Sequence, residues 1–439
     1  MHHQSESRGL GHALRWTLVA VLTGVAGGLA GLGLAALLHV IQHVAYGYSL
    51  DTLFSQESFQ AGVMAATPSR RVAILTLCGL IAGCGWWAIY RWCKPLVSIS
   101  RAVRGDSPSL PGVATTCHAL LQIVTVALGS PLGREVAPRE IGAMLAGKLS
   151  SYAALTVDES KVMVACGAGA GLAAVYNVPV AGAIYVVEGL LFSIGWRTVL
   201  PAIVTAVIAA LVARIGLGTL PQYDVPHYAC TPSLIVWSML AGPLIGLAAS
   251  QFTRLTDHAR SRAPHDSRML PYCLANFLFI GLLATLLPML LGNGKGPAQV
   301  GFDGAVSVQL AAILLLLRIL ITWTSLRSGA AGGLLTPGLC NGALLAILLG
   351  GVWSVLWPGT PAGAFAVIGA AAFLATSMRV PFTAVALIFE FTRPSPEFIF
   401  PVLLAVAGSV ATSGYLRQIL DRARRPQDDS RTAAKQAGL

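Results

Sequence analysis

The stretch Gly167-Ala168-Gly169-Ala170-Gly171-Leu172-Ala173, which runs on through Val178-Pro179 to Glu188, occurs twice in this chain. The second copy begins 202 residues later, at Gly369 instead of Gly167, and runs through Val380-Pro381 to Glu390. In both copies a carboxylate closes an uncharged run, nine residues after a proline. Two related halves with proline-interrupted apolar segments are typical of a membrane transporter or channel. In membrane proteins of this build, the substrate site lies between the halves, near the bilayer midplane.

The composition supports a polytopic, all-α membrane protein. Hydrophobic residues make up 55% of the chain and charged residues 11%, whereas soluble domains carry about 25% charged residues. A spanning helix needs about 20 apolar residues. Long uncharged runs supply them at Trp16–Leu50, Val72–Tyr90, Val162–Val187, Thr198–Ala213, Ser233–Thr253, Met269–Gly294 and Ser328–Met378.

The net charge of +11 favours a membrane surface over a nucleic acid because of where the charges lie. Basic residues cluster at the N-terminus, in Arg91–Arg104, in Arg254–Arg268 and in Arg417–Arg431, whereas the loops Ser49–Ser69 and Gly216–Pro232 contain no Lys or Arg. The positive-inside rule therefore predicts that both termini are cytoplasmic. The anionic lipid of the inner leaflet accounts for the excess charge.

Prolines divide the chain into short and broken helices. The run Ser328–Met378 has 51 uncharged residues, and one helix of that length would reach about 75 Å. It must fold back, because the hydrocarbon core is about 30 Å thick. Four helices are expected to start near Pro138, Pro179, Pro337 and Pro381, since proline is favoured in the first helical turn.

These breaks give an expected domain organisation. Residues 1–14 form a cytoplasmic segment, and residues 15–425 form one transmembrane domain with halves at about 72–214 and 233–422. Residues 426–439 are polar and are predicted to be a disordered cytoplasmic tail. The cysteines include no CxxC pair, and His39 and His43 fit an interfacial position better than a metal site. We therefore expect no metal and no cofactor.

Two of the proline-led helices follow glycine-rich loops, Gly129–Pro138 and Ser328–Pro337. Glycine allows a ligand to approach the backbone closely, and the first N–H groups of a helix have no intrahelical partner. A helix that starts inside the membrane can therefore bind a dehydrated anion. The alternative is close helix packing, for which small residues are common.

Glu135 lies at one of these helix starts. Intramembrane ionisable residues are functional candidates by default. A carboxylate beside an anion site resembles the anion, so Glu135 could block the path when ionised and open it when protonated. The alternatives are a local pair with Arg134 or a carboxylate that satisfies free N–H groups at the helix start.

These segments resemble the CLC chloride channel and transporter family. The resemblance rests on Gly133-Arg134-Glu135, on Gly329–Pro337, on Asn177–Gly182 and on Glu188, and it extends over roughly residues 14–423. It implies an inverted-repeat subunit, a homodimer with one pore per subunit, and a bacterial inner membrane location without a C-terminal regulatory domain. It further implies that Glu135 is the gate and that Leu334, Leu335, Gly133, Arg134, Gly333 and Tyr415 form the anion site.

The sequence departs from the family pattern in three places. Val136-Ala137 replaces the usual Gly-Pro, and either Lys94 or Ser98 falls at the serine that would contact the anion. Proton-coupled members carry an internal glutamate where this chain has Gly189. Glu188 is then the candidate for the proton pathway, although its counterpart Glu390 suggests a shared structural role.

The leading hypothesis is therefore a chloride pathway gated by Glu135 that is channel-like or weakly proton-dependent. The alternative is a proton-coupled exchanger for chloride or fluoride. An intramembrane enzyme fits poorly, because the sequence has neither a Gly-x-Ser-x-Gly elbow nor a His-Glu-x-x-His motif.

Overall fold

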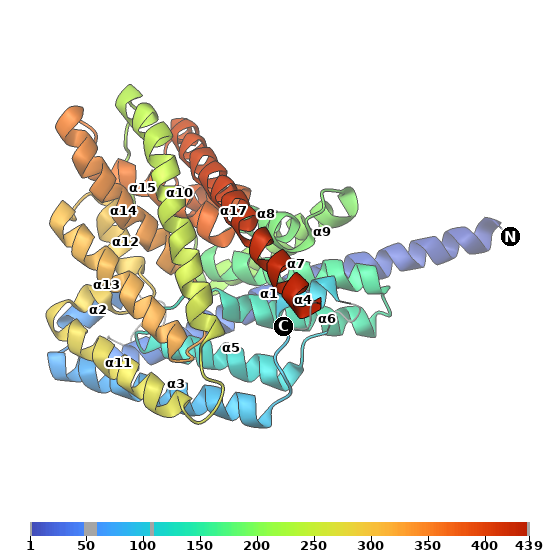
Figure 1. Cartoon of the computed structure of the whole chain (residues 1–439). Coiled ribbons are helices and arrows are strands. Elements are labelled where there is room, and N and C mark those ends of the chain that lie inside the picture. The colour runs from blue at the N-terminus through green and yellow to red at the C-terminus, as the bar shows by residue number, and fades with distance from the viewer. Residues whose placement is uncertain (1, 48–58, 106–108, 437–439) are drawn as a thin grey trace.

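The computed structural model describes residues 2–47, 59–105 and 109–436, which are almost entirely helical (Figure 1). Eight helices within these ranges are long and apolar enough to cross a membrane. The protein is thus an integral, multi-pass membrane protein, as the composition predicts. The helices are α1 (His2–Tyr46), α2 (Phe59–Ala65), α3 (Pro68–Trp92), α4 (Ile99–Arg104), α5 (Gly112–Ala127), α6 (Val136–Tyr152), α7 (Val157–Tyr176), α8 (Pro179–Tyr185), α9 (Trp196–Leu217), α10 (Pro232–Ser261), α11 (Met269–Leu286), α12 (Lys295–Phe302), α13 (Val308–Arg327), α14 (Leu335–Leu356), α15 (Ala362–Met378), α16 (Pro381–Thr392) and α17 (Ile399–Gln436).

The predicted fold-back of the long uncharged run is confirmed. Helix α14 ends at Leu356 and α15 begins at Ala362, and Pro358 and Pro361 lie in the break between them. The two helices pack against each other in antiparallel fashion (Figure 1). Proline lacks the N–H that a continuous helix would need at these positions.

The repeated sequence is also a repeated structure. Helices α7 and α15 end in left-handed residues, Asn177 at φ +57° and Arg379 at φ +59°. Val178 and Val380 follow with nearly equal backbone angles, and α8 and α16 then begin at their prolines. The chain therefore reverses in the same way in both halves, as an inverted-repeat fold requires.

The glycine loops that precede α6 and α14 repeat each other as well. Gly129 and Gly329 have φ of +108° and +101°, a region that disfavours residues with a Cβ. The next N–H groups, those of Ser130 and Ala330, donate to the carbonyl oxygens of Thr125 and Ser325 at 3.0 and 3.1 Å. Each loop thus ends one helix and directs the start of the next toward the middle of the molecule.

Helix α17 differs from the expectation of a disordered tail. It runs as one helix from Ile399 to Gln436 and so includes residues 426–436, while 437–439 lie outside the described residues. The tail is polar, but Ala, Arg, Gln and Lys are strong helix formers. Low hydrophobicity therefore did not prevent the helix from continuing.

Candidate anion site

Glu135 lies where the two halves meet. Its side chain is fully buried. Oε1 accepts a hydrogen bond from the Leu335 backbone N–H at 2.7 Å, and Oε2 accepts one from the Tyr176 hydroxyl at 3.3 Å. Glu135 precedes α6, yet its carboxylate makes no capping bond there and instead binds the first residue of α14. The carboxylate therefore sits on one of the two N–H groups predicted to bind an anion.

The glycines beside Glu135 fix this arrangement. Gly133 and Gly333 exchange two backbone hydrogen bonds, at 2.8 and 2.9 Å, in an antiparallel bridge. A Cβ on either glycine would overlap the Glu135 carboxylate. The halves thus contact each other through equivalent residues of the two loops, and both contact residues must lack side chains.

Tyr176 is a site residue that the sequence analysis missed. Its hydroxyl also lies 2.9 Å from the Thr336 hydroxyl, so it links the gate to the first turn of α14. The Arg134 guanidinium lies over the Tyr176 ring, 5.3 Å from its centroid. One feature of the sequence could have indicated Tyr176. The repeat aligns Tyr176 in the first copy with Met378 in the second, so the two copies differ at this position.

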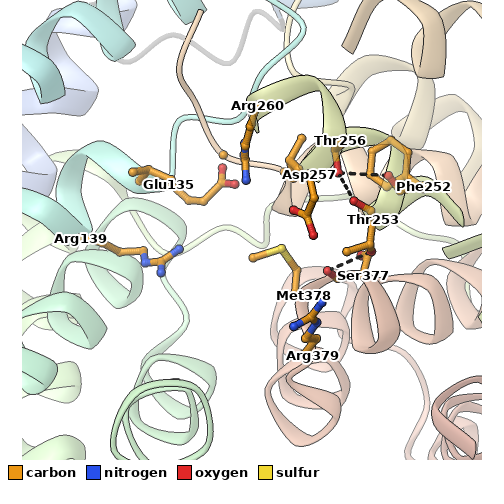
Figure 2. A pocket seen from close by; sticks show the side chains of 13 residues that line it. Glu135, Arg139, Phe252, Thr253, Thr256, Asp257, Arg260, Ser377, Met378 and Arg379 are labelled. Atoms are coloured by element: carbon orange, nitrogen blue, oxygen red, sulfur yellow. Dashed lines mark hydrogen bonds between the residues drawn. The ribbon is translucent and has the colours of Figure 1, made fainter. Parts of the chain in front are cut away.

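A cavity of about 370 Å³ opens onto Glu135, Gly333 and Leu334. Three arginines line it, Arg139 of α6, Arg260 of α10 and Arg379 after α15, whereas Asp257 is the one other acidic residue in its lining. Figure 2 shows the Arg260 guanidinium pointing toward the Glu135 carboxylate. The cavity is therefore positively charged up to the carboxylate, which favours anions there.

Two of these arginines keep donor capacity. Arg260 Nη2 donates to the Gly332 carbonyl at 3.2 Å. Arg139 donates to the Tyr185 hydroxyl and lies over the Tyr185 ring, but its buried Nε has no hydrogen-bond partner. An unpartnered buried donor is costly.

Three residues assigned to the anion site by resemblance lie elsewhere. Lys94 and Ser98 are exposed, and the Ser98 hydroxyl caps α4 by accepting the Arg101 N–H at 3.2 Å. The Tyr415 side chain is 68% exposed. None of them lines the cavity at Glu135. For Tyr415 the reason is the continuous helix α17, which does not turn back toward the centre of the molecule.

Glu188 and Glu390 form a reciprocal pair of helix caps. Glu188 accepts the N–H groups of Phe382 and Thr383, each at 2.8 Å, at the start of α16. Glu390 accepts those of Val180 and Ala181, at 3.0 and 2.8 Å, at the start of α8. Each carboxylate thus caps the other half's helix, so the shared structural role expected from the repeat is confirmed.

Comparison with known proteins places this geometry in a family. Residues 74–414 match the family described as voltage gated chloride channel. A putative chloride channel protein ClcB-like from Ralstonia nicotianae is 29% identical over 90% of this chain and 92% of its own length. An H(+)/Cl(−) exchange transporter ClcA from Salmonella arizonae is 28% identical over 71% of this chain and 70% of its own.

Solved structures show the same fold. A slow cyanobacterial Cl−/H+ antiporter has a TM-score of 0.77 at 19% identity and covers 94% of this chain and 99% of its own. A CLC-type fluoride/proton antiporter has a TM-score of 0.68 at 18% identity and covers 91% and 96%. The chain therefore belongs to the voltage gated chloride channel family of membrane anion transporters.

Proposed function

We propose that the protein exchanges chloride, or another small anion, for protons, with Glu135 as the group that both gates the anion and carries the proton. The observation that carries the proposal is the 2.7 Å hydrogen bond between the Leu335 N–H and the buried Glu135 carboxylate. An anion and an ionised carboxylate compete for this N–H. A protonated Glu135 is neutral and binds it more weakly, so protonation opens the site.

The exchange mechanism replaces the channel-like pathway favoured by the sequence alone. Relatives of this chain carry the name H(+)/Cl(−) exchange transporter, and antiporters share its fold. Gly189 favours a channel, because it occupies the position of the family's internal glutamate and glycine cannot carry a proton. The two candidates differ in one property: only an exchanger moves protons uphill when an anion gradient is applied.

In the proposed pathway, anions collect at the arginines of the cavity and reach Leu334 and Leu335 when Glu135 leaves. The basic loop that follows α10 supports a cytoplasmic position for the cavity, by the positive-inside rule. Arg134 would attract anions from the opposite side of Glu135. Gly133 and Gly333 contribute by leaving room for the Glu135 carboxylate at the Leu335 N–H.

The experiment uses purified protein in liposomes with a chloride gradient and no pH gradient. We expect protons to move in the direction opposite to the chloride flux, so that the vesicle interior becomes more acidic as chloride leaves and more alkaline as chloride enters. This pH change should persist when the membrane potential is clamped. Chloride flux without proton movement would establish the channel instead. Repeating the assay with fluoride, nitrate and bromide identifies the preferred anion.

We also propose a homodimer in a bacterial inner membrane, with one pore per subunit and lipid around it. Exposed apolar side chains on α9 and α16, among them Leu211, Ile215 and Phe382, support it. Chemical crosslinking in membranes at dilute protein would give a dimer band. A monomer that transports would contradict this assembly.

A further inference from the structure

Helices α5 and α6 bury a second acid–base pair, separate from Glu135. His118 Nδ1 lies 2.9 Å from Glu140 Oε2, and the two side chains are 10% and 15% exposed. Gln122 Nε2 lies 2.9 Å from His118 Nδ1 and 3.2 Å from Glu140 Oε2. The pair packs inside the membrane domain, where ionisable residues are expensive.

The short contact requires a hydrogen between the two atoms. Nδ1 of a neutral His118 can supply it to the Glu140 carboxylate, or a protonated Glu140 can supply it to Nδ1. In the second arrangement Nδ1 can also accept from the Gln122 amide. Two titratable side chains thus share one buried hydrogen bond, which offers a proton two alternative positions.

The pair lies between Glu135 and the side of the basic loops. Glu140 follows Glu135 by five residues on α6, about 7.5 Å along the helix axis. Helix α7 starts soon after α6 ends, and Glu159 in its first turn bonds His12 of the N-terminal helix at 2.7 Å. The far end of α6 is thus on the same side as the N-terminus, which the charge pattern assigns to the cytoplasm.

Titratable groups continue from the pair toward that side. Tyr90, near the end of α3, lies within electrostatic range of Glu140. Its ring contacts the His265 ring, with centroids 4.8 Å apart, in the basic loop before α11. On α6 itself the neighbouring cations are Arg139, in the cavity, and Lys148, beside the start of α5.

We propose that His118 and Glu140 form the cytoplasmic proton-exchange site of the transport cycle. This inference rests on the proposed function. A proton path needs titratable groups at successive depths, Gly189 offers none, and the hydrogen bonds of Glu188 to α16 commit its carboxylate to a cap. A proton from cytoplasmic water binds the pair, then leaves His118 or Glu140 and protonates the Glu135 carboxylate. Only N–H and O–H bonds form and break.

The test compares proton and chloride fluxes in liposomes for Glu140→Gln and His118→Gln. Both are expected to lower the ratio of proton to chloride flux at least tenfold while chloride still moves, and Glu140→Asp should restore part of it. The matched control is His12→Gln, which removes the histidine of the other His–Glu pair and should keep the wild-type ratio.

The outcomes separate this inference from the proposed function. Wild-type protein without uphill proton movement rejects the exchanger. A coupled wild type with unchanged coupling in Glu140→Gln and His118→Gln rejects the relay alone. If neither variant elutes as folded protein, the pair is structural and the relay is likewise rejected.

Discussion

Under the proposed function, the Leu335 backbone N–H has two competing partners, the Glu135 carboxylate and a permeating anion. Hydrogen bonds to charged groups contribute about 1.5–3 kcal/mol, so the ionised carboxylate is a strong competitor. Glu135 is fully buried and reaches this N–H at 2.7 Å, so it occupies the position that we propose for the anion. Under the proposed function, gating depends on one protonation event at one residue.

Glu135→Gln should raise passive chloride flux about tenfold and remove its pH dependence. The carboxamide carries no charge and competes poorly for the N–H. In the wild type, flux should rise as the pH falls, because protonation removes the competing anion. Chloride efflux from liposomes between pH 4.5 and pH 7.5 measures both effects. A mutant with the magnitude and pH profile of the wild type would remove Glu135 from the mechanism.

Tyr176→Phe should loosen the gate. It deletes the hydroxyl that donates to Glu135 and contacts Thr336, a loss of about 1 kcal/mol for one hydrogen bond. We expect roughly fivefold higher passive flux at neutral pH. Tyr152→Phe is the matched control, because the Tyr152 side chain is 87% exposed. Equal flux in both variants would limit Tyr176 to packing.

Arg139→Gln should raise the chloride concentration that gives half-maximal flux, because it removes a cation from the cavity lining. Initial rates over a chloride series measure this. Lys94→Gln serves as the control, since Lys94 is exposed and lies outside the cavity lining. A larger change in the half-maximal chloride concentration for Lys94→Gln than for Arg139→Gln would instead favour the pathway that the sequence resemblance implied.

At the scale of elements, two carboxylates tie the halves together. Glu188 lies in a π-helical turn, Val186–Leu191, that continues α8, and it caps α16. Glu390 lies in the last turn of α16 and caps α8. A carboxylate at a helix N-terminus is stabilised by the free N–H groups and by the helix dipole. Because each cap bridges the halves, both hold the reversals that follow α7 and α15.

Glu390→Gln and Glu188→Gln should each destabilise the protein by about 1–3 kcal/mol, the cost of weakening charge-assisted hydrogen bonds. Thermal unfolding in detergent measures it, with Glu397→Gln, in the loop before α17, as the control. Proton coupling should persist in folded Glu188→Gln. Loss of coupling at wild-type stability would instead make Glu188 the internal proton carrier.

At the scale of the whole molecule, the halves meet at equivalent glycines. The Gly133–Gly333 bridge brings together residues 200 positions apart in sequence. Two residues after these glycines the loops differ, because Glu135 in the first half corresponds by position to Leu335 in the second. One half therefore supplies the carboxylate and the other supplies the N–H that it binds.

Gly333→Ala should open the pathway without changing any charge. The added Cβ overlaps the Glu135 carboxylate and displaces it from the Leu335 N–H, so passive flux should rise as in Glu135→Gln. Gly414→Ala is the control, because a Cβ there meets no atom within 4 Å. Reduced flux in folded Gly333→Ala would mean that the methyl group obstructs the anion itself.

Residue types and their spacing were enough to predict the all-α membrane fold, the two halves, the break between α14 and α15, and the roles expected for Glu135, Leu335 and the Glu188–Glu390 pair. These features depend on local chemistry: uncharged length, proline at helix starts, glycine before them, and a repeat that assigns equal roles to equal positions. Such signals need no knowledge of distant contacts.

Which distant side chains lie together could be seen only in the packed helices. Tyr176 reaches Glu135 across 41 residues, and Arg260 reaches Gly332 across 72. His118 meets Glu140 only because α5 and α6 pack together. Conversely, Tyr415 lies away from the cavity because α17 continues as one helix through this residue. Contacts of this kind depend on helix packing and on where each helix ends, which residue types and spacing do not specify.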